Sequence, residues 1–183
     1  VGRYLVYHDE SGTDVEHQRY QLHGAMFVPR GKWRDLAAKL SEGRQGYSGR
    51  IHFKELRDNA RSSKADVARR WLTLYAREFA SDCFYKCMVD DPGDGTSMAQ
   101  RQIPEKPFYR YNHTAQLAMW SGIKWSLAEY EKVELEIYSE ELSRTAEDNF
   151  RTYVPRQLMS KGPDRNGRAN PVVEVDPRYV TLI

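Results

Sequence analysis

The spacing of apolar residues divides this chain into extended and helical segments. Apolar runs and apolar–polar alternation predict strands over residues 3–8, 20–28, 84–89, 133–138 and 172–175. Apolar residues three and four positions apart predict helices over residues 33–40, 63–78, 113–130 and 145–158. Strands that alternate with helices after an opening strand pair favour an α/β layered fold that begins with an antiparallel hairpin.

Turn-forming and capping residues set the expected limits of these segments. Ser63 with Asp66 forms a candidate capping box at the start of the second helix. Residues 41–50, 90–107 and 161–170 are rich in turn-forming or basic residues and are expected to be loops. The last strand is expected to end at Val175, with another element beginning near Tyr179.

Residues 113–130 carry apolar side chains nearly all round the predicted helix. A surface helix has one apolar stripe, whereas a helix that is apolar on most sides is buried. The sequence leaves two interpretations open. This is the central buried helix of the fold, or the region from Phe108 to Tyr130 is an interface for a second copy of the chain or another protein.

Composition indicates a globular protein and leaves its ligand open. The 183 residues are 40% hydrophobic and 30% charged, with twelve tyrosines and four tryptophans, which argues against intrinsic disorder. This length suits a single domain over residues 1–183 with a substantial core. The formal net charge is only +2, so overall charge does not establish nucleic-acid binding.

Cysteine content and hydropathy predict a cytoplasmic protein without membrane association. Cys83 and Cys87 are the two cysteines, and on a strand they would lie roughly 13 Å apart, which is too far for a disulfide. Lack of a disulfide framework suits a reducing compartment. No apolar run approaches the length of a membrane span, and no signal-peptide pattern is present.

The candidate chemistry begins at Asp9-Glu10-Ser11-Gly12, directly after the apolar run Tyr4-Leu5-Val6-Tyr7. Crowded carboxylates at a strand end suffer desolvation and mutual repulsion, and a divalent cation relieves both. The Ser-Gly pair turns the chain sharply, which places the carboxylates at the strand end instead of inside the sheet. The alternative interpretation is an ordinary solvated turn.

Three segments together resemble a widespread prokaryotic family of unknown function. They are the strand followed by DESG, the second strand with Gly24-Ala25-Met26-Phe27-Val28, and Ile51-His52-Phe53-Lys54-Glu55-Leu56. That family is recognised by an N-terminal Asp-Glu pair and a C-terminal Gln-x-x-Asp motif, and it is assigned to the ribonuclease H-like superfamily. The resemblance implies a mixed central sheet flanked by helices. It also implies hydrolysis of nucleic acid with divalent metal ions.

In the ribonuclease H-like arrangement, one acid lies on the first strand and another at the end of the fourth strand. Asp9 fits the first position, and Glu140, or else Glu141, follows residues 133–138 and fits the second by element order. Glu10 points to the opposite face of a strand from Asp9, so both bind one ion only if the strand twists or ends there. Acids before a helix also favour its N-terminal dipole, which is the alternative interpretation of Glu140.

Two-metal hydrolysis requires three or four carboxylates that hold two Mg²⁺ or Mn²⁺ ions about 3.5–4 Å apart. The candidate metal ligands are Asp9, Glu10 and Glu140, because Mg²⁺ prefers oxygen ligands. His52 and Glu55 would share one face of a helical turn, as a ligand or proton-relay pair requires. The alternative is a surface histidine near a salt-bridged glutamate. Asp9, Glu10 and Glu140, together with His52 and Glu55, form the candidate catalytic set.

The chain contains no Gln-x-x-Asp motif. In the family this motif lies on a helix just after the last strand, which is where this chain stops. We therefore expect a fold truncated at its C-terminus, with the motif beyond Ile183, or else a copy that lacks one metal ligand.

The leading interpretation is a metal-dependent nuclease acting on DNA or RNA, in defence or mobile-element biology. Basic residues at 44–50 and 161–168 are candidate contacts to phosphates, and residues 101–110 mix cations with aromatic rings as single-strand binders do. Each is alternatively a solvated surface. A catalytically silent module that binds nucleic acid or protein is the main rival. Hydrolysis of a small phosphorylated compound is a third reading, and no P-loop or dinucleotide-binding fingerprint supports a nucleotide version.

Overall fold

The computed structural model describes residues 1–11, 20–51, 61–91, 107–139, 149–163 and 169–182. The chain divides into two compact units, one formed by residues 1–28 with 84–183 and the other by residues 29–83. The organisation of residues 1–183 as a single domain stays a prediction, and the two units are described here one at a time.

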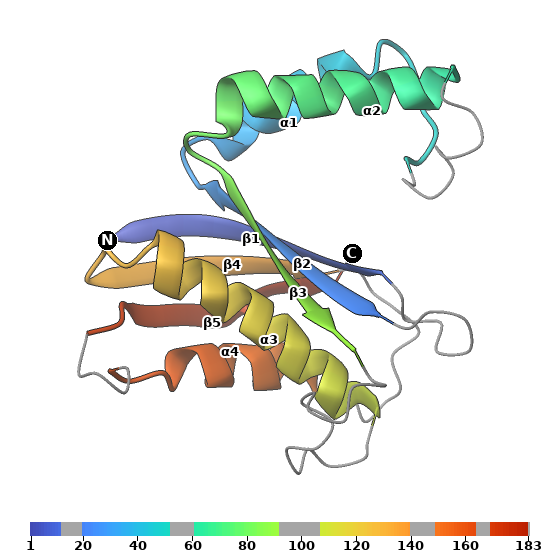
Figure 1. Cartoon of the computed structure of the whole chain (residues 1–183). Coiled ribbons are helices and arrows are strands. Elements are labelled where there is room, and N and C mark those ends of the chain that lie inside the picture. The colour runs from blue at the N-terminus through green and yellow to red at the C-terminus, as the bar shows by residue number, and fades with distance from the viewer. Residues whose placement is uncertain (12–19, 52–60, 92–106, 140–148, 164–168, 183) are drawn as a thin grey trace. The chain divides into compact units, whose positions relative to one another are not determined.

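The larger unit is built on a five-stranded mixed sheet in the order β3-β2-β1-β4-β5 (Figure 1). The strands are β1 (Gly2–Ser11), β2 (Gln21–Pro29), β3 (Phe84–Asp90), β4 (Lys132–Ser139) and β5 (Val172–Leu182). β4 is parallel to both β1 and β5, and β2 is antiparallel to β3. β2 also runs opposite to β1 in Figure 1. The predicted α/β class, with a mixed sheet and an antiparallel opening pair, is confirmed.

The parallel strands β1 and β4 end at the same edge of the sheet. Their register runs from Gly2 opposite Val133 to His8 opposite Ser139, the last described residue of β4. The strand β1 extends to Ser11, three residues beyond its predicted end, so Asp9 and Glu10 belong to the last part of the strand. Carboxyl ends of parallel strands are the usual position of binding sites in α/β folds.

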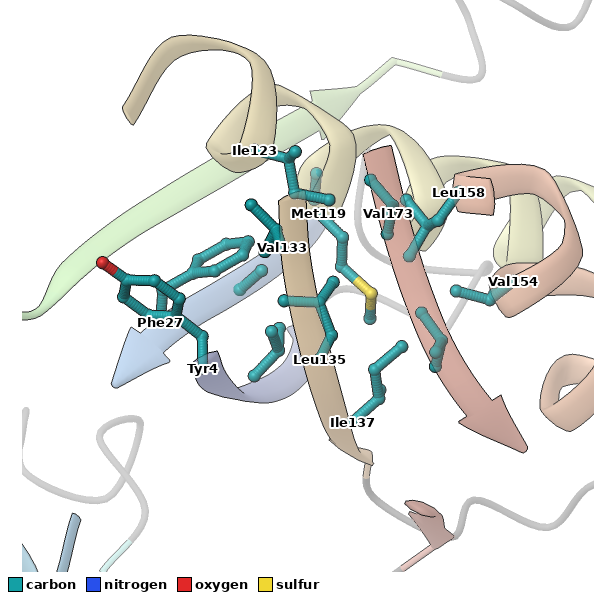
Figure 2. Close-up of a cluster of buried hydrophobic side chains, with 14 of the residues drawn as sticks. Tyr4, Phe27, Met119, Ile123, Val133, Leu135, Ile137, Val154, Leu158 and Val173 are labelled. Carbon is teal, nitrogen blue, oxygen red and sulfur yellow. The ribbon is translucent and has the colours of Figure 1, made fainter. Parts of the chain in front are cut away.

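Two helices, α3 (Pro107–Ser126) and α4 (Phe150–Met159), cover one face of this sheet (Figure 1). The core lies between that face and the helices, as Figure 2 shows. Alternate residues of β4 are buried, which is the pattern expected of a strand with one face on a core. The core includes Tyr4, Val6, Ala25, Phe27, Met119, Ile123, Val133, Leu135, Ile137, Val154, Leu158 and Val173.

Close approach of α3 to β2 depends on a glycine. A Cβ atom added to Gly122 would lie 2.4 Å from Cε2 and 2.6 Å from Cζ of Phe27. The Phe27 ring is fully buried and stacks on Phe84 with a centroid distance of 4.6 Å. The missing side chain at position 122 therefore lets the helix backbone rest directly on this ring pair.

The helix α3 begins six residues earlier and ends earlier than the predicted 113–130. Pro107 at its start is favourable because proline suits the first turn, where its missing N–H has no helical partner. Ala115, Met119 and Ile123 are fully buried against the sheet, which agrees with the interpretation as a central buried helix. No helix within the described ranges is long and apolar enough to cross a membrane.

β5 corrects the expectation of two separate C-terminal elements, because it is one strand through residue 182. The register with β4 shifts between Leu135 and Ile137, which accommodates an irregularity opposite the Asp176-Pro177 step. β5 lies at the edge of the sheet and carries this proline in its irregular stretch, and edges and bulges are the two places where a strand accommodates proline.

The smaller unit contains α1 (Trp33–Gly43) and α2 (Ser63–Leu74), which continues into the π-helical turn η2 (Tyr75–Phe79). α1 runs three residues into the predicted loop 41–50 and is followed by two residues with positive φ, Gln45 and Gly46. The N-cap of α2 is Ser62 instead of Ser63, and its side chain accepts a hydrogen bond from the Ala65 N–H.

Candidate functional site

Asp9 lies near the end of β1 with an exposed side chain. Its Oδ1 accepts a hydrogen bond from the backbone N–H of Glu10 at 3.0 Å. The preceding residue, His8, is paired with Ser139 at the end of β4. Asp9 therefore lies one residue beyond the last described pair of two parallel strands, with its carboxylate on the sheet face away from α3 and α4.

Glu10 points to the opposite face, as expected from the alternation of a strand. Its side chain is 2% exposed, and its Oε2 accepts a hydrogen bond from the hydroxyl of Tyr111 on α3 at 2.6 Å. Nδ1 of His8 lies 4.0 Å from the same oxygen. The structure thus separates the two neighbouring acids: Asp9 faces outward, and Glu10 is held inside the fold.

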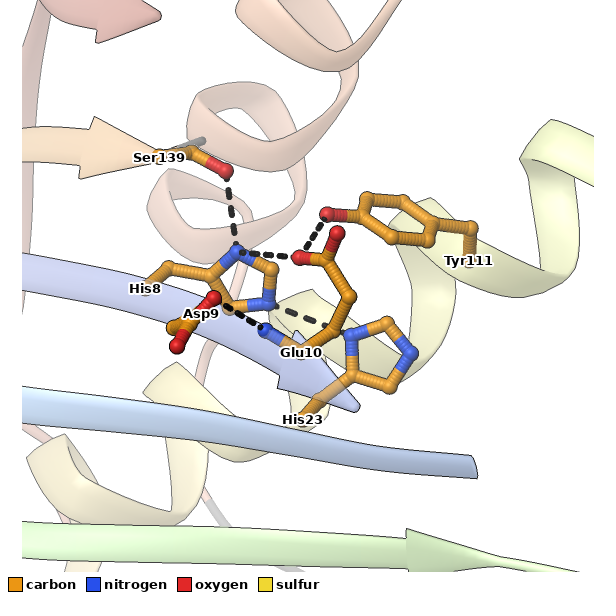
Figure 3. A network of polar contacts seen from close by, with 6 residues as sticks. All are labelled: His8, Asp9, Glu10, His23, Tyr111 and Ser139. Atoms are coloured by element: carbon orange, nitrogen blue, oxygen red, sulfur yellow. Dashed lines mark hydrogen bonds and ion pairs between the residues drawn. The ribbon is translucent and has the colours of Figure 1, made fainter. Parts of the chain in front are cut away.

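His8 links three strands through its side chain (Figure 3). Its Nδ1 lies 2.9 Å from Oγ of Ser139 on β4, and its Nε2 lies 3.1 Å from Nδ1 of His23 on β2. The two imidazole rings stack at 5.4 Å, and the Tyr111 ring packs edge-on against both. All these contacts lie on the buried face, directly behind Asp9, so they fix the end of β1 against its neighbours.

The sequence alone gives little reason to pair these two histidines, because the spacing of His8 and His23 matches no metal-binding pattern. One signal was available: His8 lies two residues after buried Val6, so alternation places it on the core face. A buried polar side chain requires hydrogen-bond partners, and these come from β2, β4 and α3.

Burial controls the ionisation of His23. The desolvation of the ring lowers its pKa from 6.5 to about 4, and the nearby negative charge of Asp90 opposes this shift only in part. Asp90 is itself buried and pairs with Nε of Arg110 at 2.6 Å. His23 is therefore neutral near pH 7, which is compatible with its contact with the His8 ring.

This lowered pKa predicts that the protein loses stability in weak acid. Between pH 6.5 and about 4 the unfolded chain binds a proton at His23 that the folded chain does not, so the free energy of unfolding falls as pH falls through this window. The expected slope is up to about 1.4 kcal/mol per pH unit. Urea unfolding at pH 7.0, 6.0 and 5.0 measures it. A His23→Phe variant should show a shallower slope, and equal slopes in both proteins would contradict this assignment.

The aromatic and basic residues at the start of α3 have partners within the fold. Phe108 stacks on Tyr109 at 4.8 Å, and Tyr109 packs edge-on against Tyr153 of α4. Arg110 pairs with Asp90. These contacts support a structural role for the described part of residues 101–110. Residues 101–106 lie outside the described ranges.

In the smaller unit, Arg44 also has a structural role. Its Nη1 donates to the backbone carbonyls of Tyr47 and Gly49, at 3.3 and 3.0 Å, and its guanidinium lies over the Trp71 ring. These contacts hold the turn that follows α1. These contacts explain the position of Arg44 without a phosphate ligand, and the predicted phosphate contact at 44–50 stays a prediction.

Three of the five candidate catalytic residues, His52, Glu55 and Glu140, lie outside the described residues. Within the described ranges, no group of three or more His, Cys, Asp or Glu side chains is arranged to hold a metal ion. The exposed carboxylate of Asp9 is the hard oxygen donor that Mg²⁺ or Mn²⁺ prefers. Glu10, on the other face, does not converge with it. Of the two candidate ligands that the structure describes, Asp9 alone has an exposed carboxylate.

No protein-family model matches the sequence, and no curated protein matches it. Among solved structures, the chain is similar to Bst-RNase HIII in complex with Mn²⁺, with a TM-score of 0.46 and 13% identity over 98% of this chain. A mutant of Bst-RNase HIII gives a TM-score of 0.45 and 13% identity over 97% of this chain. Each match covers 47% of the other protein, so this chain spans about half the length of the structures that it matches.

Proposed function

We propose that this chain is a metal-dependent nuclease that hydrolyses phosphodiester bonds of DNA or RNA. The observation that carries the proposal is the alignment of β1 with β4. His8 pairs with Ser139, and the next residues along the two parallel strands are Asp9 and Glu140. Asp9 thus lies at the carboxyl edge of the sheet, and Glu140, which follows β4 in the sequence, is the second acid by element order.

Asp9 and Glu140 would hold the divalent ions, with oxygen ligands that suit Mg²⁺ or Mn²⁺. When bound, such ions activate the attacking water and stabilise the leaving oxygen of the phosphodiester. Glu10 would position Asp9 from the buried face of the sheet, because its hydrogen bond with Tyr111 holds the end of β1 in place. His52 and Glu55 remain candidates for a further ligand or a proton relay, on the strength of the family resemblance. That resemblance also favours a role against foreign nucleic acid.

A catalytically silent binding module is the second candidate. The same surface would then bind nucleic acid or protein without cleaving it.

A cleavage assay distinguishes the two functions. The purified chain is incubated with end-labelled single- and double-stranded DNA and RNA in Mg²⁺, in Mn²⁺ or in EDTA. We expect cleavage of at least one substrate with metal and none in EDTA, because the reaction depends on the bound ions. Binding without cleavage under all metal conditions would reject the nuclease and support the binding module.

A further inference from the structure

Tyr85 on β3 occupies an unusual position over the sheet. A Cβ atom added to Gly24 on β2 would lie 2.1 Å from the Tyr85 hydroxyl oxygen and 2.8 Å from its Cε2 and Cζ atoms. The ring therefore leans across the neighbouring strand into the space left by the glycine. It is nevertheless 57% exposed. Tyr85 is thus an aromatic ring supported by the backbone beneath it and open to solvent above.

The same ring is electrostatically close to Asp9. The pKa of Tyr85 is raised to about 12 by burial of its hydroxyl, by the Cys87 thiol and by the negative charge of Asp9. Phe84, the residue before Tyr85, packs on the core, so Tyr85 faces away from α3 and α4, as Asp9 does. The ring and the proposed metal ligand therefore share one face of the sheet.

Two further tyrosines lie on the same face of the sheet. Tyr7 on β1 and Tyr138 on β4 are paired in register, and their rings stack at 5.1 Å with an interplanar angle of 18°. Tyr7 is 36% exposed and precedes Asp9 by two residues, which is roughly 6.5 Å along a strand. Tyrosine rings from three strands thus lie on the same face of the sheet as Asp9.

We infer that Tyr85, with Tyr7 and Tyr138 on the same face of the sheet, stacks on unpaired bases, and that the nucleic acid held at Asp9 is single-stranded. This inference rests on the proposed nuclease and names its class of substrate. Aromatic rings bind single strands because every base has a flat face that stacks without regard to sequence. In a duplex these faces are covered by neighbouring base pairs, so the rings would have nothing to stack on.

Oligonucleotide affinity measured in EDTA tests the base contact without cleavage. Fluorescence anisotropy with a labelled single-stranded 15-mer should show binding weakened about 5- to 150-fold by Tyr85→Ala. Tyr85→Phe, which keeps the ring, should bind within about twofold of wild type. Gly24→Ala should weaken binding as well, because the added methyl group displaces the ring from its position. Trp125→Ala is the matched control, since it removes a 67% exposed aromatic from α3.

Thiol reactivity provides a second measurement in the unmodified protein. Cys87 is exposed and lies two residues after Tyr85 on the same strand, whereas Cys83 is buried. A saturating single strand should therefore slow the reaction of Cys87 with a thiol reagent, and a duplex of equal length should not. Equal rates with and without the single strand would overturn the inference. A Cys87 that is unreactive in the free protein would also overturn it, by showing that another surface covers this face.

Failure of this inference and failure of the nuclease proposal give different results. Metal-dependent cleavage that is unaffected by Tyr85→Ala would leave the nuclease intact and overturn the stacking role. Cys87 protection and Tyr85-dependent binding without any cleavage would keep the base contact and reject the nuclease.

Discussion

Replacing Asp9 by asparagine is expected to reduce metal-dependent cleavage by roughly a thousandfold or more. Asparagine keeps the size of the side chain but removes the charge that binds the cation. A bound metal ion contributes several kcal/mol of transition-state stabilisation, and each 1.4 kcal/mol corresponds to about tenfold in rate. Because Asp9 is exposed, the free energy of unfolding should change by less than about 0.5 kcal/mol. Single-turnover kinetics measures the loss of cleavage, and Mn²⁺ titration calorimetry measures the loss of metal binding. Urea unfolding measures the change in stability.

Glu10→Gln is the matched comparison, because it makes the same chemical change on the next residue and the opposite face. Its carboxylate accepts the Tyr111 hydroxyl inside the fold. We expect a loss of stability of about 1–3 kcal/mol and Mn²⁺ affinity close to that of wild type. If Glu10→Gln abolished Mn²⁺ binding while Asp9→Asn retained it, Glu10 would be the metal ligand and the assignment of Asp9 would be contradicted.

Replacing Phe27 by alanine is expected to cost about 3–5 kcal/mol of stability. The ring is fully buried, stacks on Phe84 and supports α3 at Gly122, so its removal leaves a cavity between helix and sheet. Such a loss is a large part of the about 5–15 kcal/mol that stabilises an ordinary domain. Chemical denaturation followed by circular dichroism provides the measurement.

Val172→Ala serves as the control for this substitution. Val172 is 62% exposed on the edge strand β5, so its truncation should change stability by no more than about 0.5 kcal/mol. A loss below about 1 kcal/mol for Phe27→Ala, or equal losses for the two variants, would contradict the packing of α3 on this ring.

Local periodicity was sufficient to predict the order of elements. All five strands and four helices occur in the predicted order, because strand alternation and helical spacing are short-range properties of the chain. Boundaries were less well predicted. β1, α1 and β5 extend three to seven residues beyond their predicted ends, and α3 differs from its predicted range at both ends.

The sequence by itself determined that Asp9 and Glu10 lie on opposite faces if the strand continues through both residues. The strand does continue to Ser11, which the structure and not the sequence established. The sequence also determined that Asp9 lies near a strand end, since turn-forming residues follow.

Only the tertiary structure decided what surrounds these acids. The contacts of His8 with Ser139 and of Tyr111 with Glu10 join residues more than a hundred positions apart. Likewise, the position of Tyr85 over Gly24 depends on the register of β3 on β2. Register and helix packing are set by burial of the whole core, because a shift of one residue would move every side chain to the wrong face. No pattern within a single segment carries that information.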